Sequence, residues 1–220
     1  MCRYKKIDLE NWCRKEHYLY YTSSLNVEVN MTANIDVSEL LSFCHTNGYK
    51  FYPTLIYCVT KVLNRIDNFK MFKDKNGDLC VWDSLVPNYT IFHEEDHTFS
   101  DCWTDFTDDF DSFYKNITYD MKLGKTKRGI KVKSGQPANF YCVSCTPWTA
   151  FTAVSSRMVN GGAAFFPIIT AGKYDDNYQM PVNITIAHAV ADGYHIGLFF
   201  EYLQEEVSAK CLLSNLSNLK

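Results

Sequence analysis

The chain has 220 residues, which fits one large domain or two small ones, and we expect a single domain that spans residues 1–220. With 46% hydrophobic and 21% charged residues, and with 15 Phe and 15 Tyr, it can bury a substantial core, which excludes a disordered or fibrous protein. The formal net charge of −3 excludes the broad basic surface that binds a polyanionic backbone, so nucleic acid is not an expected partner.

The first predicted elements are a strand and a helix. Apolar and polar residues alternate over 25–31, which predicts a half-buried strand. Asp36 is predicted to cap the helix that follows, with Glu39 three residues later as in a capping box, and Gly48 is predicted to end it.

The rest of the chain alternates between strand-like and helical patterns. Pro53 is predicted to open a second helix in its first turn, and the basic run 122–135 is predicted to be a loop. Strand-like segments recur at 79–83, 87–93, 139–146, 165–171 and 180–187, and helical spacing occurs at 108–121 and 194–207. Strands interleaved with helices predict an α/β fold, in the form of a two-layer sandwich with a mixed β-sheet and packed helices.

The N-terminal charges and the cysteines indicate a cellular compartment. No apolar h-region follows residues 1–8, and no later stretch has about 18 uncharged apolar residues. Nine cysteines occur, several within apolar patterns such as those around Cys44 and Cys58, which is typical of reduced thiols in a cytosol. We therefore expect a soluble, cytoplasmic protein that does not act at a membrane.

The segment that points most clearly to chemistry is the strand and turn around residue 188. Alternating apolar residues predict a strand that delivers His188 at its end, and Asp192 stands where a helix N-cap belongs. A rigid strand fixes the backbone of such a histidine, and an unperturbed imidazole titrates close enough to neutral pH to serve as a general base. A lone histidine is nevertheless more often a buried structural residue, and the pattern His-x-x-x-Asp-Gly alone is weak.

Eight motifs occur in order along nearly the whole chain. They are NWCRKEH (11–17), YKFYP (49–53), VWDS (81–84), YTIFH (89–93), TFS (98–100), VSCTPW (143–148), PIITAGKY (167–174) and HAVADGYH (188–195). Together they resemble the classical trimeric type of chloramphenicol acetyltransferase. The pattern His-x-x-x-Asp-Gly is also shared with other coenzyme A-dependent acyltransferases, such as dihydrolipoyl acyltransferases. The resemblance implies the coenzyme A-dependent acyltransferase fold.

The resemblance also implies a reaction. It implies acetyl transfer from acetyl-coenzyme A to a hydroxyl of chloramphenicol, with His188 as the general base and Ser144 as a donor to the tetrahedral oxyanion. Without the resemblance, Ser144 is an ordinary strand serine. Asp192 could be taken for a triad carboxylate, but the resemblance implies a buried ion pair between Asp192 and Arg14 that shapes the active-site loop.

Acetyl-coenzyme A is expected as a co-substrate and not as a permanently bound cofactor. The resemblance assigns Lys50 and Lys173 to the 3′-phosphate and Tyr174 to the adenine, and it places Tyr52 and Trp148 along the cofactor tunnel. Individually, these are ordinary surface lysines and core aromatics. Together, two point cations and a stacking ring suit an adenosine phosphate.

The acceptor pocket is where the sequence departs from the family pattern. The resemblance assigns it to Tyr20, Tyr21, Leu25, Val27, Phe99, Cys142, Ser156 and Thr170. Ala187 replaces a second histidine, Cys142 an asparagine and Ser156 a large apolar residue, and the loop 122–135 is more basic than usual. Two alternatives therefore stay open: an O-acetyltransferase for a different alcohol, and a homologue that binds acetyl-coenzyme A or a small hydrophobe without turnover.

Two further expectations concern metals and assembly. Cys142 and Cys145 lack the second pair of ligands of a structural zinc site, and His195 is interpreted as packing near a helix start, so no metal is expected. The resemblance implies a homotrimer with active sites between subunits. In that arrangement His188 comes from one chain, and pocket residues such as Tyr21 and Phe99 come from its neighbour.

Overall fold

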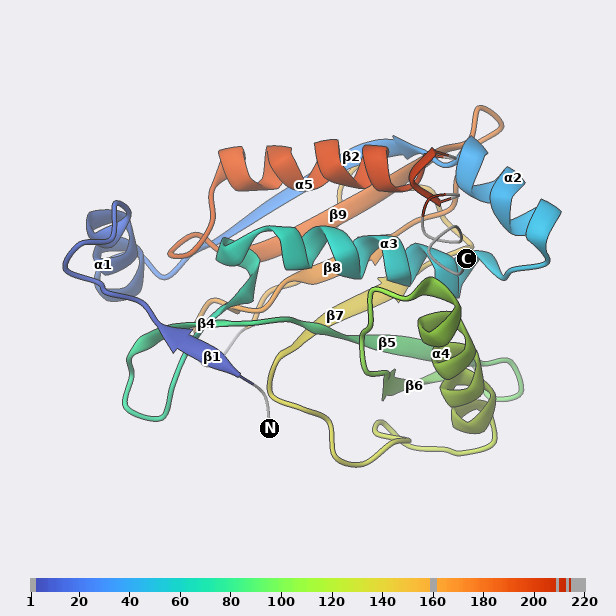
Figure 1. The fold of residues 1–220 in the computed structure, drawn as a ribbon, viewed down its shortest axis with the longest axis horizontal. Helices are drawn as coiled ribbons and strands as arrows, with labels where there is room; N and C mark the ends of the chain where they lie inside the picture. The colour runs from blue at the N-terminus through green and yellow to red at the C-terminus, as the bar shows by residue number, and fades with distance from the viewer. Residues whose placement is uncertain (1–2, 159–161, 209, 213, 215–220) are drawn as a thin grey trace.

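The computed structural model describes residues 3–158, 162–208, 210–212 and 214 (Figure 1). Its elements in chain order are β1 (Tyr4–Lys6), α1 (Lys15–Ser23), β2 (Glu28–Asp36), α2 (Ser38–Asn47), α3 (Phe51–Arg65), the 3₁₀ turn η1 (Asp67–Lys70), β3 (Met71–Lys73), β4 (Leu79–Trp82), β5 (Val86–His93), β6 (Thr98–Trp103), α4 (Phe110–Lys125), β7 (Phe140–Cys145), β8 (Ile168–Ala171), β9 (Gln179–Ala187) and α5 (Gly193–Glu206).

A six-stranded sheet forms the centre of the fold. Its strand order is β2-β9-β8-β7-β5-β6, in which β7 is parallel to both β5 and β8 and the other neighbours are antiparallel. A separate sheet has the order β1-β4-β3. The predicted α/β fold with a mixed sheet is therefore confirmed.

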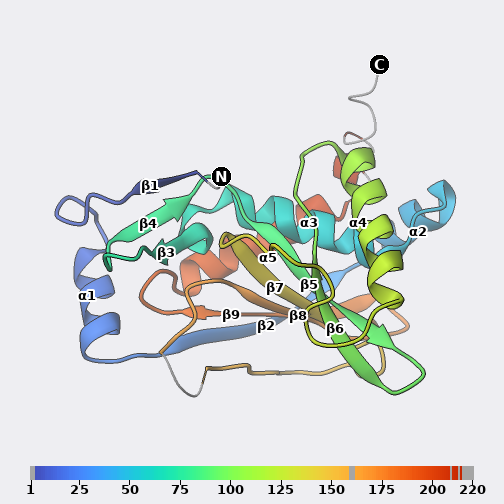
Figure 2. The same ribbon diagram turned by 90° about the horizontal axis from the view of Figure 1, so that it is seen from below.

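Helices α3 and α5 cover one face of the large sheet (Figures 1 and 2). The strand β9 presents a continuous apolar row to this layer because its alternate residues are branched aliphatics. The core that results includes the fully buried side chains Ile56, Val59, Val182, Ile184, Ile186, Ile196 and Phe199. The two layers of the predicted sandwich are thus the sheet and this helical layer.

The ends of α2 and α3 follow the predicted signals with one exception. Gly48 ends α2 in the left-handed conformation with φ 73°, and Pro53 lies in the first turn of α3. Asp36 caps the helix with its side chain as predicted, but the N-cap position is Val37, because Asp36 still pairs with Gln179 as the last residue of β2. The helix begins at Ser38, whose backbone N–H donates to Asp36 Oδ1 at 2.9 Å.

The loop predicted at 122–135 also begins later than expected. Helix α4 continues to Lys125, through a glycine that would usually weaken it. A Cβ atom at Gly124 would lie 2.4 Å from Ile91 Cδ1, so the glycine lets α4 approach β5 closely. Here the glycine serves helix-to-sheet packing and does not end the helix.

The apolar alternation at 25–31 faces the core only in its second half. Strand β2 begins only at Glu28, and the side chains of Leu25, Val27 and Met31 are 45%, 39% and 40% exposed. Val29 packs against the core opposite Ile186, and Met31 stands opposite Ile184 on the same face. The strand is therefore half-buried as expected from Glu28 onward, with Met31 partly exposed because β2 is an edge strand. None of the described helices combines the length and the apolar character needed to cross a membrane.

Candidate active site

His188 lies where β9 ends and the chain turns toward α5. Its backbone N–H donates to the Val27 carbonyl at 3.0 Å, which continues the β2–β9 ladder past Ala187. Its Nδ1 lies 3.1 Å from the Ala191 carbonyl oxygen. Because a carbonyl can only accept a hydrogen bond, Nδ1 carries the proton and Nε2 keeps its lone pair. The ring is held in the tautomer that a general base needs.

Tyr21, in the last turn of α1, stacks on the His188 ring of the same chain. The ring centroids are 4.0 Å apart and the planes differ by 17°. This contact restricts the imidazole on one side. The expectation that Tyr21 is supplied to the His188 site by a neighbouring chain is wrong, because α1 leads directly into the segment whose Val27 carbonyl binds His188.

Asp192 caps α5 and forms an ion pair with Arg14. Arg14 Nη1 donates to Asp192 Oδ2, and His195 Nδ1 lies 2.8 Å from Asp192 Oδ1. Partial burial raises the pKa of Asp192, but the hydrogen bonds from Arg14 and His195 outweigh this effect and lower it to about 2. Both carboxylate oxygens are thereby engaged away from His188. Asp192 is not the carboxylate of a catalytic triad.

His195 has a larger part in this arrangement than the sequence indicated. It stands three residues after the N-cap Asp192, in the position of the second member of a capping box. Its ring nitrogen at 2.8 Å orients the carboxylate whose other oxygen meets Arg14. The spacing Asp-x-x-His at a helix start was the available signal. We interpreted it only as packing.

Replacement of Asp192 by asparagine is expected to lower the free energy of unfolding at pH 7 by roughly 2–4 kcal/mol. The Arg14 side chain is only 12% exposed and would lose its counter-ion. In the native chain the Asp192 pKa is about 2, below its unfolded value, so its contribution is complete above about pH 4 and is lost as the pH falls toward 2. Urea unfolding at pH 7 and pH 3 measures both effects.

Asp176→Asn, at an exposed residue, is the matched control for this change. The Asp192→Asn protein should lose less stability between pH 7 and pH 3 than the wild type. An Asp192→Asn protein as stable as the control at pH 7 would refute the structural role of the ion pair.

Ser144 lies in β7, on the face of the sheet away from the helices. Its neighbours Val143 and Tyr141 are buried in the core, and Ser144 alternates with them. In the sheet register Ser144 stands opposite Thr170, and Thr170 stands opposite Asn183. His188 follows Asn183 by five residues along the chain, which corresponds to about 17 Å. A single chain therefore does not bring Ser144 to His188.

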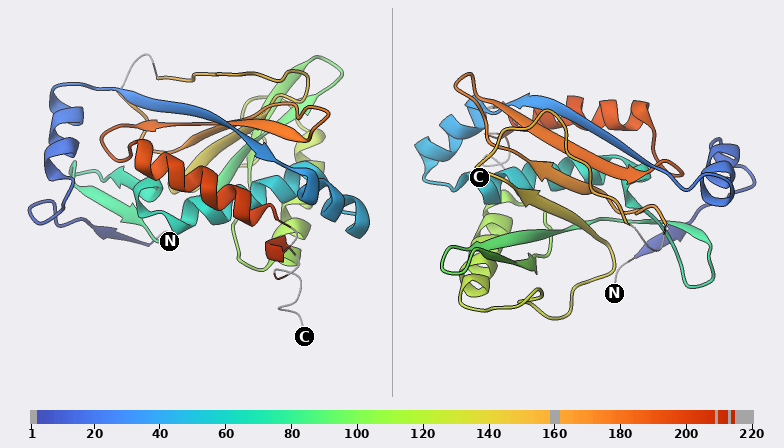
Figure 3. Two further views of the ribbon diagram at one scale, coloured as in Figure 1. Left: turned by 90° about the horizontal axis from the view of Figure 1, so that it is seen from above. Right: turned by 180° about the vertical axis from the view of Figure 1, so that it is seen from behind.

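A fork between β5 and β7 lies beside Ser144. The pairing of these parallel strands ends at Tyr89 and Val143, after which β5 continues with β6 and β7 continues with β8 (Figures 1 and 3). The hydroxyl of Tyr52, from the first turn of α3, donates to the Val143 carbonyl at 3.3 Å at this point. On the far side, the rings of Phe92 and Trp148 are 4.8 Å apart.

The segments that follow β7 and β8 hold the other candidate donor-binding residues. The backbone N–H of Thr146 donates to Ala171 and that of Lys173 to Thr149, so the two segments run side by side. The ring of Tyr174 lies 6.2 Å from that of Phe51 at the start of α3. The structure thus gathers Lys50, Tyr52, Trp148, Lys173 and Tyr174 around the fork, at the carboxyl ends of two parallel strands, a common place for ligands in α/β sheets.

The candidate acceptor residues divide into two groups. Tyr20, Tyr21, Leu25 and Val27 belong to the α1–β2 segment that contacts His188. Phe99, Cys142 and Thr170 belong to the sheet strands near Ser144. Ser156 lies with the first group, because its neighbours Ser155 and Arg157 line one hollow with Val27. The two groups are separated in the chain in the same way as His188 and Ser144.

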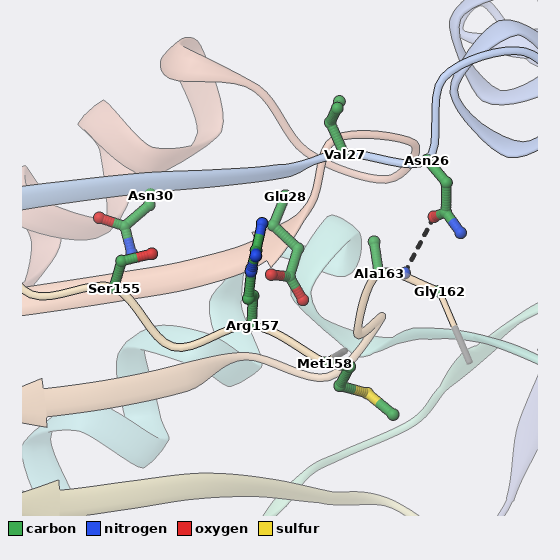
Figure 4. A pocket seen from close by; sticks show the side chains of 9 residues that line it. All are labelled: Asn26, Val27, Glu28, Asn30, Ser155, Arg157, Met158, Gly162 and Ala163. Atoms are coloured by element: carbon green, nitrogen blue, oxygen red, sulfur yellow. Dashed lines mark hydrogen bonds between the residues drawn. The ribbon is translucent and has the colours of Figure 1, made fainter. Parts of the chain in front are cut away.

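A hollow of about 460 Å³ opens beside Val27, between β2 and the segment that holds Ser156 (Figure 4). Glu28 and Arg157 are its charged lining residues, and Met158 adds an apolar wall. We did not single out these three residues from the sequence, which carries no local pattern that joins them. The hollow lies beside the segment whose Val27 carbonyl accepts from the His188 backbone N–H, but His188 is not one of its lining residues.

The cysteines of β7 do not indicate a metal or a nucleophile. Burial raises the pKa of both Cys142 and Cys145 to about 11, so they are neutral thiols near pH 7. Within the described residues, no group of three His, Cys, Asp or Glu side chains could hold a metal ion.

Comparison with known proteins gives consistent matches over the chain. A model of the chloramphenicol acetyltransferase family matches residues 2–204. A chloramphenicol acetyltransferase from Clostridium perfringens is 39% identical over 209 residues, which cover 94% of this chain and 95% of that protein. One from Staphylococcus aureus is 37% identical over 205 residues, with 92% and 94% covered.

Solved structures share the fold. A chloramphenicol acetyltransferase superposes with a TM-score of 0.78 at 23% identity and covers 94% of this chain and 99% of its own. A dihydrolipoamide acetyltransferase from Azotobacter vinelandii gives a TM-score of 0.64 at 14% identity, with 91% and 88% covered. The fold implied by the sequence motifs is confirmed.

Proposed function

Because the chain belongs to the chloramphenicol acetyltransferase family, we propose that it transfers the acetyl group of acetyl-coenzyme A to a hydroxyl of chloramphenicol and so inactivates the antibiotic. The observation that carries this proposal is the fixed tautomer of His188. Its Nδ1–H is engaged by the Ala191 carbonyl, and the free Nε2 can accept a proton.

The reaction proceeds by direct attack. Nε2 of His188 takes the proton of the acceptor hydroxyl while the oxygen attacks the thioester carbonyl carbon. The tetrahedral intermediate carries its negative charge on the former carbonyl oxygen, to which the Ser144 hydroxyl donates. Its collapse breaks the carbon–sulfur bond, and the imidazolium returns the proton to the departing thiolate. Direct transfer agrees with the raised pKa of Cys142 and Cys145, because neither thiol beside Ser144 is ionised to form an acyl-enzyme.

The separation of His188 from Ser144 supports a site formed by two copies of the chain. Each copy would supply His188 with Tyr21 at one interface and Ser144 with the donor-binding fork at the next. Such head-to-tail contacts close into a ring, and we infer a cyclic trimer. Apolar side chains next to His188, among them Leu25 and Val27, are exposed in the single chain and would be buried there.

Three residues that depart from the family pattern were expected to alter the acceptor pocket, but the side chain of one of them, Ala187, does not reach the surface of the chain. Ala187 is fully buried, and its backbone N–H donates to Ala164. Cys142 lies on the sheet face with Ser144, where the Asn88 amide approaches its sulfur at 3.9 Å. The acceptor side of the site therefore differs from the family pattern at Cys142 and Ser156, and chloramphenicol must be tested directly.

Release of free thiol from acetyl-coenzyme A, with and without chloramphenicol, tests the proposed function. We expect release that depends on chloramphenicol. Thiol release only with another alcohol would show that the protein is an acetyltransferase whose acceptor is not chloramphenicol. No release with a broad panel of alcohols would favour a homologue that binds without turnover.

A further inference from the structure

A hollow of about 550 Å³ lies between the start of α3 and one face of α4. The α4 residues that line it recur at helical spacing, so they share one side of the helix. They are Lys115, Thr118, Tyr119, Met121, Lys122 and Lys125, and they face Lys50, Tyr52 and Pro53 of the α3 start.

The lining of this hollow is basic. Four of its nine residues are lysines and none is Asp or Glu, although the chain as a whole has a net charge of −3. Elsewhere in the described chain several lysines form ion pairs, for example Lys131 with Asp101 and Lys133 with Asp120. No ion pair is found for the lysines of the hollow within the described residues. The four lysines are exposed, so solvent weakens their mutual repulsion, and an anion that entered the hollow would be attracted by all four.

The helix dipole explains only part of this cluster. Lys122 and Lys125 lie in the last turn of α4, where positive charge stabilises a helix. Lys115 lies about two turns earlier, beyond the reach of that effect, and Lys50 belongs to another helix. The helix dipole therefore does not explain why Lys115 and Lys50 line the same hollow as Lys122 and Lys125.

Tyr52 connects the hollow to the reaction site. Tyr52 lines the hollow, and its hydroxyl donates to the carbonyl of Val143 at the fork. Val143 directly precedes Ser144. Coenzyme A has its thiol at one end of a pantetheine arm, its diphosphate at the other end of that arm, and the 3′-phosphoadenosine beyond. When the thioester lies at Ser144 and the arm passes Tyr52, the diphosphate is the first anionic group to emerge on the α4 side.

We propose that the α4 lysines Lys115, Lys122 and Lys125 bind the diphosphate of coenzyme A, while the 3′-phosphate is left to Lys50 and Lys173. The proposal rests on the proposed function, because it requires the pantetheine arm of acetyl-coenzyme A to pass between β5 and β7. It adds to that function an anion site on a helix that none of the sequence motifs includes.

The test is a double substitution, Lys122→Gln with Lys125→Gln, and direct binding measured by calorimetry. Three probes are used. Coenzyme A carries both the diphosphate and the 3′-phosphate, dephospho-coenzyme A carries only the diphosphate, and pantetheine carries neither. We expect the affinity for the first two to fall by the same factor, about tenfold, and that for pantetheine to stay unchanged. The loss should shrink as salt concentration rises.

The matched control is Lys5→Gln with Lys75→Gln, which removes the same charge at exposed lysines of the smaller sheet and its turn. It should bind all three probes as the wild type does. Unchanged affinity of the α4 variant for coenzyme A would overturn the proposal, as would a loss confined to coenzyme A or an equal loss for pantetheine. These outcomes do not depend on turnover, whereas failure of the proposed function would appear as wild-type protein that releases no thiol.

Discussion

Replacement of His188 by alanine is expected to lower kcat by about 10²–10⁴-fold. The alcohol of the acceptor is a poor nucleophile until its proton is removed, and Nε2 of His188, which has no hydrogen-bond partner among the described residues, is the base that we propose for this step. The change also removes the ring on which Tyr21 stacks, so KM for the acceptor should rise as well. Steady-state thiol release at saturating concentrations of both substrates separates the two effects.

The control for this variant is His45→Ala, at an exposed histidine of α2. It should retain wild-type kcat. Far-ultraviolet circular dichroism should be unchanged in both proteins, because the backbone hydrogen bond from residue 188 to Val27 remains. The unfolding midpoint of the His188→Ala protein should fall only slightly, since the change removes the hydrogen bond to Ala191 and the ring on which Tyr21 stacks. A His188→Ala protein within about tenfold of the wild-type rate would contradict its role as the base.

Replacement of Ser144 by alanine is expected to lower kcat by about 10²–10³-fold with little change in KM for acetyl-coenzyme A. The hydroxyl donates to an oxygen that carries full negative charge only in the tetrahedral intermediate, so its loss weakens the transition state and not the ground state. Initial rates over a range of acetyl-coenzyme A concentrations measure both constants.

Ser112→Ala, on the exposed side of α4, is the matched control for this variant. If the Ser144→Ala protein kept its kcat and raised only the KM for acetyl-coenzyme A, Ser144 would be a binding residue and the oxyanion would need another donor.

Local signals predicted the parts of the fold that a short stretch of chain determines. The strand before His188 and the helix after Asp192 were both predicted because each carries its own period and cap. Gly48 and Pro53 marked helix ends for the same reason. The strand β6 was missed, since it is a short strand with two exposed residues at its start and a weak apolar pattern.

Features that depend on contacts between distant segments were not predictable. The register between β7, β8 and β9, which separates Ser144 from His188, follows from pairing across the sheet. The residues around Ser144 and around His188 give no indication of this register. The alternation at 25–31 predicted a half-buried strand correctly at Val29, which packs against the core, but not at Leu25 and Val27, which precede β2 and are exposed. Periodicity identifies an apolar face and does not tell whether the same chain or another copy buries it.

The shared site is the central claim, and mixing two inactive variants tests it most directly. His188→Ala chains retain Ser144, and Ser144→Ala chains retain His188, so an interface between them in one orientation contains both groups. Random mixing in a cyclic trimer makes about one quarter of the sites intact, and activity after co-refolding should approach that fraction of wild type, with a mass near three chains by light scattering. Tyr21→Ala mixed with His188→Ala is the matched negative control, since both residues lie on the same side of an interface and no intact site can form. Activity no higher than the mean of the two separate variants, or a fully active wild-type protein with the mass of one chain, would contradict a site formed between copies.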